Sequence, residues 1–162
     1  MNPIDWLTAQ APGFGQLSDE ERQAIMHFAL LWSFFEARVL QNSASANAIQ
    51  TAVQNGIGKV DLQTFQEPFA YFRDRYFQNN NSTSHFDGLH FRANDKRPLV
   101  EAVLNGTNQN PVDFVTALLL IVWRLRNNLF HGVKWAYGIH DQLGNFINAN
   151  TVLMNSMDLA SN

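Results

Sequence analysis

The stretch NPVDFVTALLLIVWRLRNNLFHG, residues 110–132, sets the architecture expected for this chain of 162 residues. Asn110 and Pro111 suit the N-cap and first position of a helix, because asparagine accepts a free backbone N–H there and proline lacks one. At about 100° per residue, its aliphatic side chains form one apolar stripe, made of Leu118, Ile121, Val122, Leu125 and Leu129. Gly132 suits the C′ position that ends a helix. The stretch is therefore predicted to be a long core helix.

Other segments with helical spacing lie on both sides of this helix. Ser18 and Glu21 form a capping-box pattern, in which each residue satisfies a free backbone N–H near the other. Further apolar residues recur at helical spacing. Helices are expected at residues 18–40, from 42–45 to before 56, from 61 onward, at 98–104 and at about 139–159.

Residues 78–98 are polar and rich in turn-forming residues, so they are expected to form a long loop that is functional or mobile. The chain has no internal repeat, no glycine-rich phosphate loop and no convincing strand pattern. The prediction is therefore an all-α bundle of about five to six helices, with residues 1–16 as an N-terminal arm and residues 17–162 as one domain.

The composition narrows the class of protein. Charged residues make up only 15% of the chain, so some apolar surface is expected to be covered by another subunit. The chain has no cysteine, which excludes disulfides and thiolate chemistry, and residues 1–16 have no signal-peptide pattern, so a cytoplasmic location is expected. The longest apolar run, residues 117–123, is too short for a membrane span.

The end of the principal helix carries two polar faces. Arg124, Asn127, Asn128 and His131 are separated by three, four or seven residues, which predicts a polar surface seam. Arg126 lies about 140° around the helix from His131, so a straight helix does not aim both side chains at one atom. Either the helix unwinds before Gly132, or a second copy of the chain completes the site. Periodicity alone also fits an ordinary solvated helix end, where histidine is favoured by the helix dipole.

The motif Arg126-Asn127-Asn128-Leu129-Phe130-His131-Gly132 resembles the signature of the HEPN superfamily, an arginine, a polar residue, three further residues and a histidine at the end of a bundle helix. The first long helix with Trp32-Ser-Phe-Phe-Glu36, the late position of the motif and the one helix after it are similar to the family over nearly the whole chain.

The resemblance implies a metal-independent endoribonuclease, usually a homodimer with a composite site. It gives Arg126 and His131 the catalytic places and Asn127 the polar place beside the arginine. The 2′-OH of RNA would attack the adjacent phosphate and leave a 2′,3′-cyclic phosphate end, with His131 moving a proton and Arg126 stabilising charge. Substrate-binding roles are expected for the residues around them: Arg124, Asn128, Lys134 and Glu36.

No metal or cofactor is expected. The five histidines (His27, His85, His90, His131 and His140) show no zinc-type spacing, and the sequence has no carboxylate cluster. His140 is a further candidate for the site because it follows Gly132 closely.

Two other classes of protein remain open. The first is a non-catalytic HEPN-like module that binds RNA, nucleotide or a partner protein. The net charge of −3 favours such a module over a protein that binds a long stretch of RNA. The second is an unrelated helical scaffold.

A toxin–antitoxin, phage-defence or stress setting with an antitoxin or regulatory partner is expected for the ribonuclease. Phe130 departs from one toxin branch, which commonly has a modifiable tyrosine there, so regulation by modification at this position is not expected.

Overall fold

A computed structural model of the chain describes residues 1–132 and 138–160. In these residues the regular secondary structure is helical apart from one small hairpin, so the predicted all-α class is confirmed. The helices outnumber the five or six that were predicted: α1 (Pro3–Gln10), α2 (Asp19–Val39), α3 (Ala46–Gly56), α4 (Gln66–Tyr76), α5 (Ser84–Asp87), α6 (Arg97–Leu104), α7 (Pro111–Phe130) and α9 (Leu143–Asn155). Short 3-10 helices cover 14–16, 57–59, 62–65 and 157–160.

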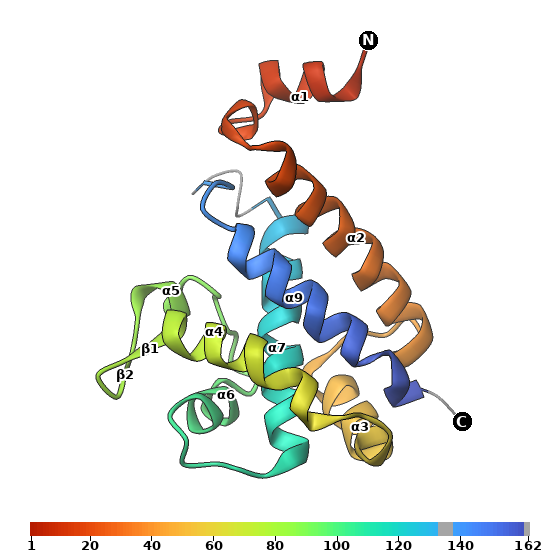
Figure 1. Cartoon of the computed structure of the whole chain (residues 1–162), viewed down its shortest axis with the longest axis vertical. Coiled ribbons are helices and arrows are strands. Elements are labelled where there is room, and N and C mark those ends of the chain that lie inside the picture. The colour runs from red at the N-terminus through yellow and green to blue at the C-terminus, as the bar shows by residue number, and fades with distance from the viewer. Residues whose placement is uncertain (133–137, 161–162) are drawn as a thin grey trace.

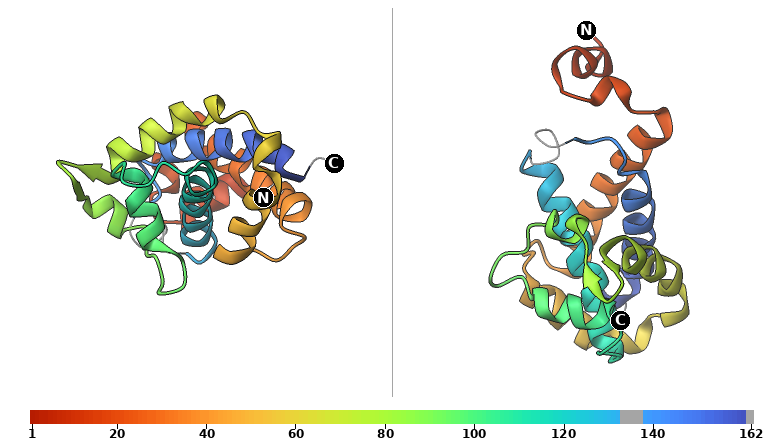
Figure 2. Two further views of the ribbon diagram at one scale, coloured as in Figure 1. Left: turned by 90° about the horizontal axis from the view of Figure 1, so that it is seen from below. Right: turned by 90° about the vertical axis from the view of Figure 1, so that its left-hand side faces the viewer.

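Helix α7 runs through the centre of the bundle (Figure 1). Helices α2 and α9 pack side by side along much of their length, and α3 and α6 pack on the first half of α7. The view along α7 shows the other helices arranged around it (Figure 2, left). The motif at residues 126–131 therefore lies at the end of the central helix.

The predicted capping residues begin the two longest helices. The Ser18 hydroxyl accepts from the N–H of Glu21 at 3.1 Å, and the Glu21 carboxylate accepts from the N–H of Ser18 at 2.8 Å. Asn110 Oδ1 accepts from the N–H groups of Val112 and Asp113 at 2.9 and 3.2 Å. These contacts satisfy backbone donors that have no partner inside a helix. Both start signals are confirmed.

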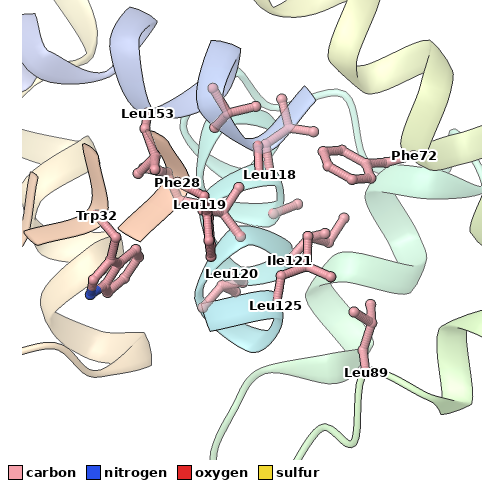
Figure 3. Packing of buried hydrophobic residues seen from close by; sticks show 14 of the residues in the cluster. Phe28, Trp32, Phe72, Leu89, Leu118, Leu119, Leu120, Ile121, Leu125 and Leu153 are labelled. Atoms are coloured by element: carbon pink, nitrogen blue, oxygen red, sulfur yellow. The ribbon is translucent and has the colours of Figure 1, made fainter. Parts of the chain in front are cut away.

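The apolar core forms around α7 (Figure 3). The predicted stripe of α7 is buried, which confirms it as a core face. Leu119 and Leu120 are fully buried as well, so α7 has apolar neighbours nearly all around it and not on one side alone. Phe28 and Trp32 of α2, Phe72 of α4 and Leu153 of α9 belong to the same cluster.

Two predicted boundaries are wrong. Residues 78–98 are not a plain loop, because strands β1 (Phe77–Gln78) and β2 (Asn81–Ser82) pair as an antiparallel hairpin and α5 follows it. Asn79 and Asn80 form the two-residue turn with φ of 50° and 61°, the left-handed backbone that such turns require and asparagine tolerates. The last helix begins at Leu143 and not near 139.

The expected N-terminal arm contains α1, which has no buried residue, followed by a 3-10 turn that buries Phe14. Figure 1 shows α1 at one end of the molecule, away from α3 and α6. No helix within the described residues combines the length and apolar character needed to cross a membrane.

Candidate functional site

The candidate site begins where α7 ends. The helix is regular to Phe130, and His131 is its C-cap, with φ −88° and ψ 11°. Gly132 has φ of 76°, a left-handed conformation that glycine adopts without steric cost. The prediction that Gly132 ends this helix is confirmed, and the helix does not unwind ahead of it.

Arg126 is held between two aromatic rings. Its guanidinium carbon lies 5.7 Å from the centroid of Trp32 on α2 and 5.3 Å from that of Phe130. These are cation–π distances, and the side chain is 27% exposed, so the charge is partly sheltered from water. The rings fix the guanidinium plane at the surface and leave part of it open to a ligand.

Polar contacts complete the position of Arg126. Its Nη1 donates to Asn127 Oδ1 at 3.0 Å, and its Nη2 lies 3.8 Å from Glu36 Oε2. The same Glu36 oxygen accepts from Trp32 Nε1 at 2.9 Å. Glu36 and Arg126, which are 90 positions apart in the sequence, thus lie side by side in the structure.

His131 lies close to this cluster along the helix but makes no hydrogen bond to it. Its side chain is exposed and has no hydrogen-bond partner among the described residues. The backbone N–H of His131 donates to the carbonyl oxygen of Asn127 at 2.9 Å. This is the ordinary main-chain bond of an α-helix, so Asn127 orients the side chain of Arg126 and not that of His131.

Arg124, Asn128 and also Asn127, which is 8% exposed, are in the interior, so the predicted exposed seam is wrong at these three positions and holds only at His131. Only 3% of Arg124 and 2% of Asn128 are exposed. Arg124 Nη1 pairs with Asp95 Oδ2 at 3.0 Å, and its Nε donates to the Leu89 carbonyl at 3.0 Å. Asn128 donates to the carbonyl oxygens of Gly88 and Leu89.

Periodicity within one helix missed this burial because the partners of both side chains come from the 78–98 segment. Burial lowers the pKa of Arg124, with Arg92 acting in the same direction, while Asp95 opposes the shift. Arg124 and Asn128 therefore hold the 88–95 segment against α7, and their buried polar groups face this segment and not a substrate.

The remaining candidates contribute less. Lys134 lies outside the described residues. His140 is exposed and its Nδ1 lies 3.1 Å from Asp141 Oδ2. Among the described residues, no group of three histidine or carboxylate side chains gathers where a metal ion can be held.

Trp32 and Phe130 were not predicted as parts of the site. Two sequence signals were available: Trp32 precedes Glu36 by four residues, and Phe130 follows Arg126 by four, so each pair shares a helix face. Neither pattern indicates that α2, which carries Trp32, lies against the end of α7, which carries Arg126.

Comparisons of the chain with protein-family models, curated proteins and solved structures found no match.

Proposed function

We propose that the protein is a metal-independent endoribonuclease of the HEPN type. The observation that carries the proposal is the placement of the Arg126 guanidinium against Trp32, Phe130 and the Asn127 side chain, five residues before His131 at the end of the central helix. Arg126 is oriented by two rings and an amide, and the His131 imidazole is exposed. An oriented guanidinium beside an exposed imidazole suits phosphate chemistry on RNA.

In the proposed reaction, the 2′-oxygen of a ribose forms a bond to the adjacent phosphorus, and the bond from phosphorus to the 5′-oxygen breaks. The 2′-OH loses one proton and the leaving 5′-oxygen gains one. His131 serves one of these transfers, since imidazole both takes and gives a proton near neutral pH. Arg126 stabilises charge on the non-bridging oxygens. The products carry a 2′,3′-cyclic phosphate and a 5′-OH.

The contacts within one chain support a composite site in a homodimer. Arg126 and His131 are not hydrogen-bonded to each other, and α7 is regular between them. Next to them lies an apolar groove of about 760 Å³, between α1, α2 and the end of α7. Met26 and Phe130 line it with 53% and 54% of their surfaces exposed. Exposed apolar side chains of this size favour association, and a second copy brings a second His131 near Arg126.

A non-catalytic RNA- or partner-binding module is the second candidate function. It is favoured by Glu36, whose carboxylate compensates part of the Arg126 charge in the free protein. A toxin, phage-defence or stress role belongs to the first candidate, with an antitoxin or other regulatory protein covering the same site.

The test is to incubate purified protein with total RNA in EDTA, beside His131→Ala and, as a matched control, His27→Ala, another exposed histidine. The proposal expects cleavage to 2′,3′-cyclic phosphate ends by the wild type and by the control, and none by His131→Ala. Equal cleavage by all three would assign the activity to something other than this site. A folded, inactive wild type that still binds RNA would favour the second candidate.

A further inference from the structure

A second hollow, of about 340 Å³, lies between the end of α4, the α5 segment, α7 and the start of α9. Figure 1 shows α5 and α2 on opposite sides of α7, so this hollow is separate from the Arg126 cluster, which faces α2. The volume is within the range of small-molecule sites. The polar side chains that line it are Arg75, Ser84, His85, His90, Gln142 and Asn145.

The charge of the hollow is one-sided. Arg75 carries a full positive charge, and no described residue lining the hollow carries a carboxylate. The acidic residues closest in sequence have other partners, because Asp74 pairs with Arg73 at 3.1 Å and Asp87 pairs with Arg97 at 3.0 Å. Within the described residues, no carboxylate comes within ion-pair distance of Arg75. The hollow therefore attracts an anion.

Arg75 is held in place with donors to spare. The Thr83 hydroxyl donates to its carbonyl oxygen at 2.8 Å. Its Nε is shut off from solvent, so a ligand in the hollow would meet the terminal nitrogens of the guanidinium. Burial raises the pKa of both Tyr71 and Tyr76, while the Arg75 charge and hydrogen bonds from its guanidinium oppose the shift, so the two tyrosines help to hold the guanidinium in place.

The side-chain amides of Asn145 and Gln142, which also line the hollow, leave one N–H donor available to a ligand. Asn145 Oδ1 accepts from the hydroxyls of Tyr71 and Tyr76, at 3.2 and 3.4 Å. Asn145 Nδ2 in turn donates to Gln142 Oε1 at 2.7 Å. The Gln142 carbonyl is thereby occupied, while its amide nitrogen has no partner among the described residues and is free to donate.

His85 and His90 lie at the rim of the hollow, on a chain segment that is anchored to α7. Thr83 caps α5, and Phe86 is fully buried beneath it. Arg124 and Asn128 bind the carbonyl oxygens just before His90, which itself has φ of 53°. Each imidazole has at least one ring N–H in either protonation state. The hollow thus presents one fixed cation and several N–H donors.

We propose that this hollow binds a small phosphate monoester, with the phosphate oxygens on Arg75 and on the rings of His85 and His90. A dianionic phosphate matches the excess of donors, and guanidinium contacts to phosphate are among the stronger hydrogen bonds in proteins. The remaining volume accommodates a sugar-sized group beside Gln142 and Ser84. The proposal assigns a role to the 78–98 segment and does not depend on ribonuclease activity.

Isothermal titration calorimetry tests the proposal with ribose 5-phosphate, inorganic phosphate and ribose as probes. We expect saturable binding of both phosphates and none of ribose. Arg75→Gln is expected to weaken binding at least about tenfold, since one charged bidentate contact is lost. Arg73→Gln removes the same charge two residues away on the exposed face of α4 and is the matched control, with a change below about twofold.

His85→Ala is a second variant that does not disturb α4, with His27→Ala as its control. It keeps the test decisive if Arg75→Gln proves unstable in a thermal melt. Absence of saturable phosphate binding, or equal weakening by a variant and its control, would overturn the proposal. A 5′-phosphorylated dinucleotide titrated in parallel identifies the source of the phosphate: tighter binding than ribose 5-phosphate assigns the site to an RNA end. His131→Ala should bind ribose 5-phosphate as tightly as the wild type does. The binding result can therefore be interpreted even if the ribonuclease proposal fails.

Discussion

Arg124 and Asp95 form an ion pair inside the protein, with 3.0 Å between Nη1 and Oδ2 and side chains only 4% and 7% exposed. Asp95 Oδ2 also accepts from the backbone N–H of Arg92 at 2.8 Å. The pair joins the middle of α7 to a chain segment about 30 residues earlier. A buried charge that keeps its partner is tolerated, whereas one that loses it is costly.

Asp95→Ala should therefore lower the free energy of unfolding by about 3–5 kcal/mol, because it leaves the Arg124 guanidinium buried and unpaired. Urea denaturation measures the loss. Asp74→Ala, which breaks the exposed pair with Arg73, is the control and should change stability by less than about 1 kcal/mol. Similar losses in the two variants would mean that the Arg124 charge reaches water.

Glu36→Gln should strengthen RNA binding, because it removes the negative charge 3.8 Å from Arg126 while an amide oxygen can still accept from Trp32 Nε1. We expect about a two- to fivefold tighter complex at low salt, with a smaller effect at high salt. Fluorescence anisotropy of labelled RNA with the His131→Ala background measures this. Glu20→Gln at the exposed start of α2 is the control. A gain shared by both variants would indicate a general charge effect and no role for Arg126.

Mixing two inactive variants tests the composite dimer. If Arg126 of one copy acts with His131 of the other, a mixture of Arg126→Ala and His131→Ala chains contains mixed dimers with one intact site. Random pairing of equal amounts should restore about a quarter of wild-type cleavage. Each variant alone should remain inactive. No recovery after verified subunit exchange would place both residues of each site in one chain. Met26→Glu should abolish the recovery, because it puts a charge in the apolar groove.

Gly56→Ala should destabilise the fold by about 1–3 kcal/mol, since overpacking forces neighbouring chain to shift. A Cβ at Gly56 would meet the carbonyl oxygen and Cα of Leu159, which are backbone atoms and cannot rotate away. Gly58→Ala is the control, because a Cβ there meets nothing within 4 Å. Thermal melts of the two variants should separate clearly. Equal melting temperatures would show that the 3-10 turn carrying Leu159 moves aside freely.

The sequence was most informative where a residue acts within its own helix. Ser18, Asn110 and Gly132 mark helix ends through bonds or backbone conformations that involve only nearby residues, and all three were predicted correctly. The apolar stripe of α7 was correct for the same reason. The resemblance also directed attention to Glu36, which the structure brings to Arg126.

Prediction failed where the partner is distant in the sequence. Arg124 and Asn128 are polar residues in a helical pattern that looks exposed, and only the fold shows that Asp95 and two carbonyl groups meet them in the interior. The hairpin at Asn79 and Asn80 was missed because its strands are two residues long, too short for any alternation to be seen. The Trp32 ring over Arg126 likewise requires knowledge of how α2 crosses α7.

The pairing of α2 with α9 has a consequence for how the protein is made. Helix α2 leaves the ribosome before α9, yet the surface that covers its Phe28 side chain includes Phe146 of α9, with ring centroids 5.1 Å apart. More than a hundred residues must be synthesised between the two, and contacts of such sequence separation form slowly. The core therefore closes only after residue 155 has emerged, and until then the part of α2 that faces α9 stays uncovered. Arg126 and Glu36 in turn can meet only after α7 has emerged, so an earlier nascent chain does not carry the assembled site.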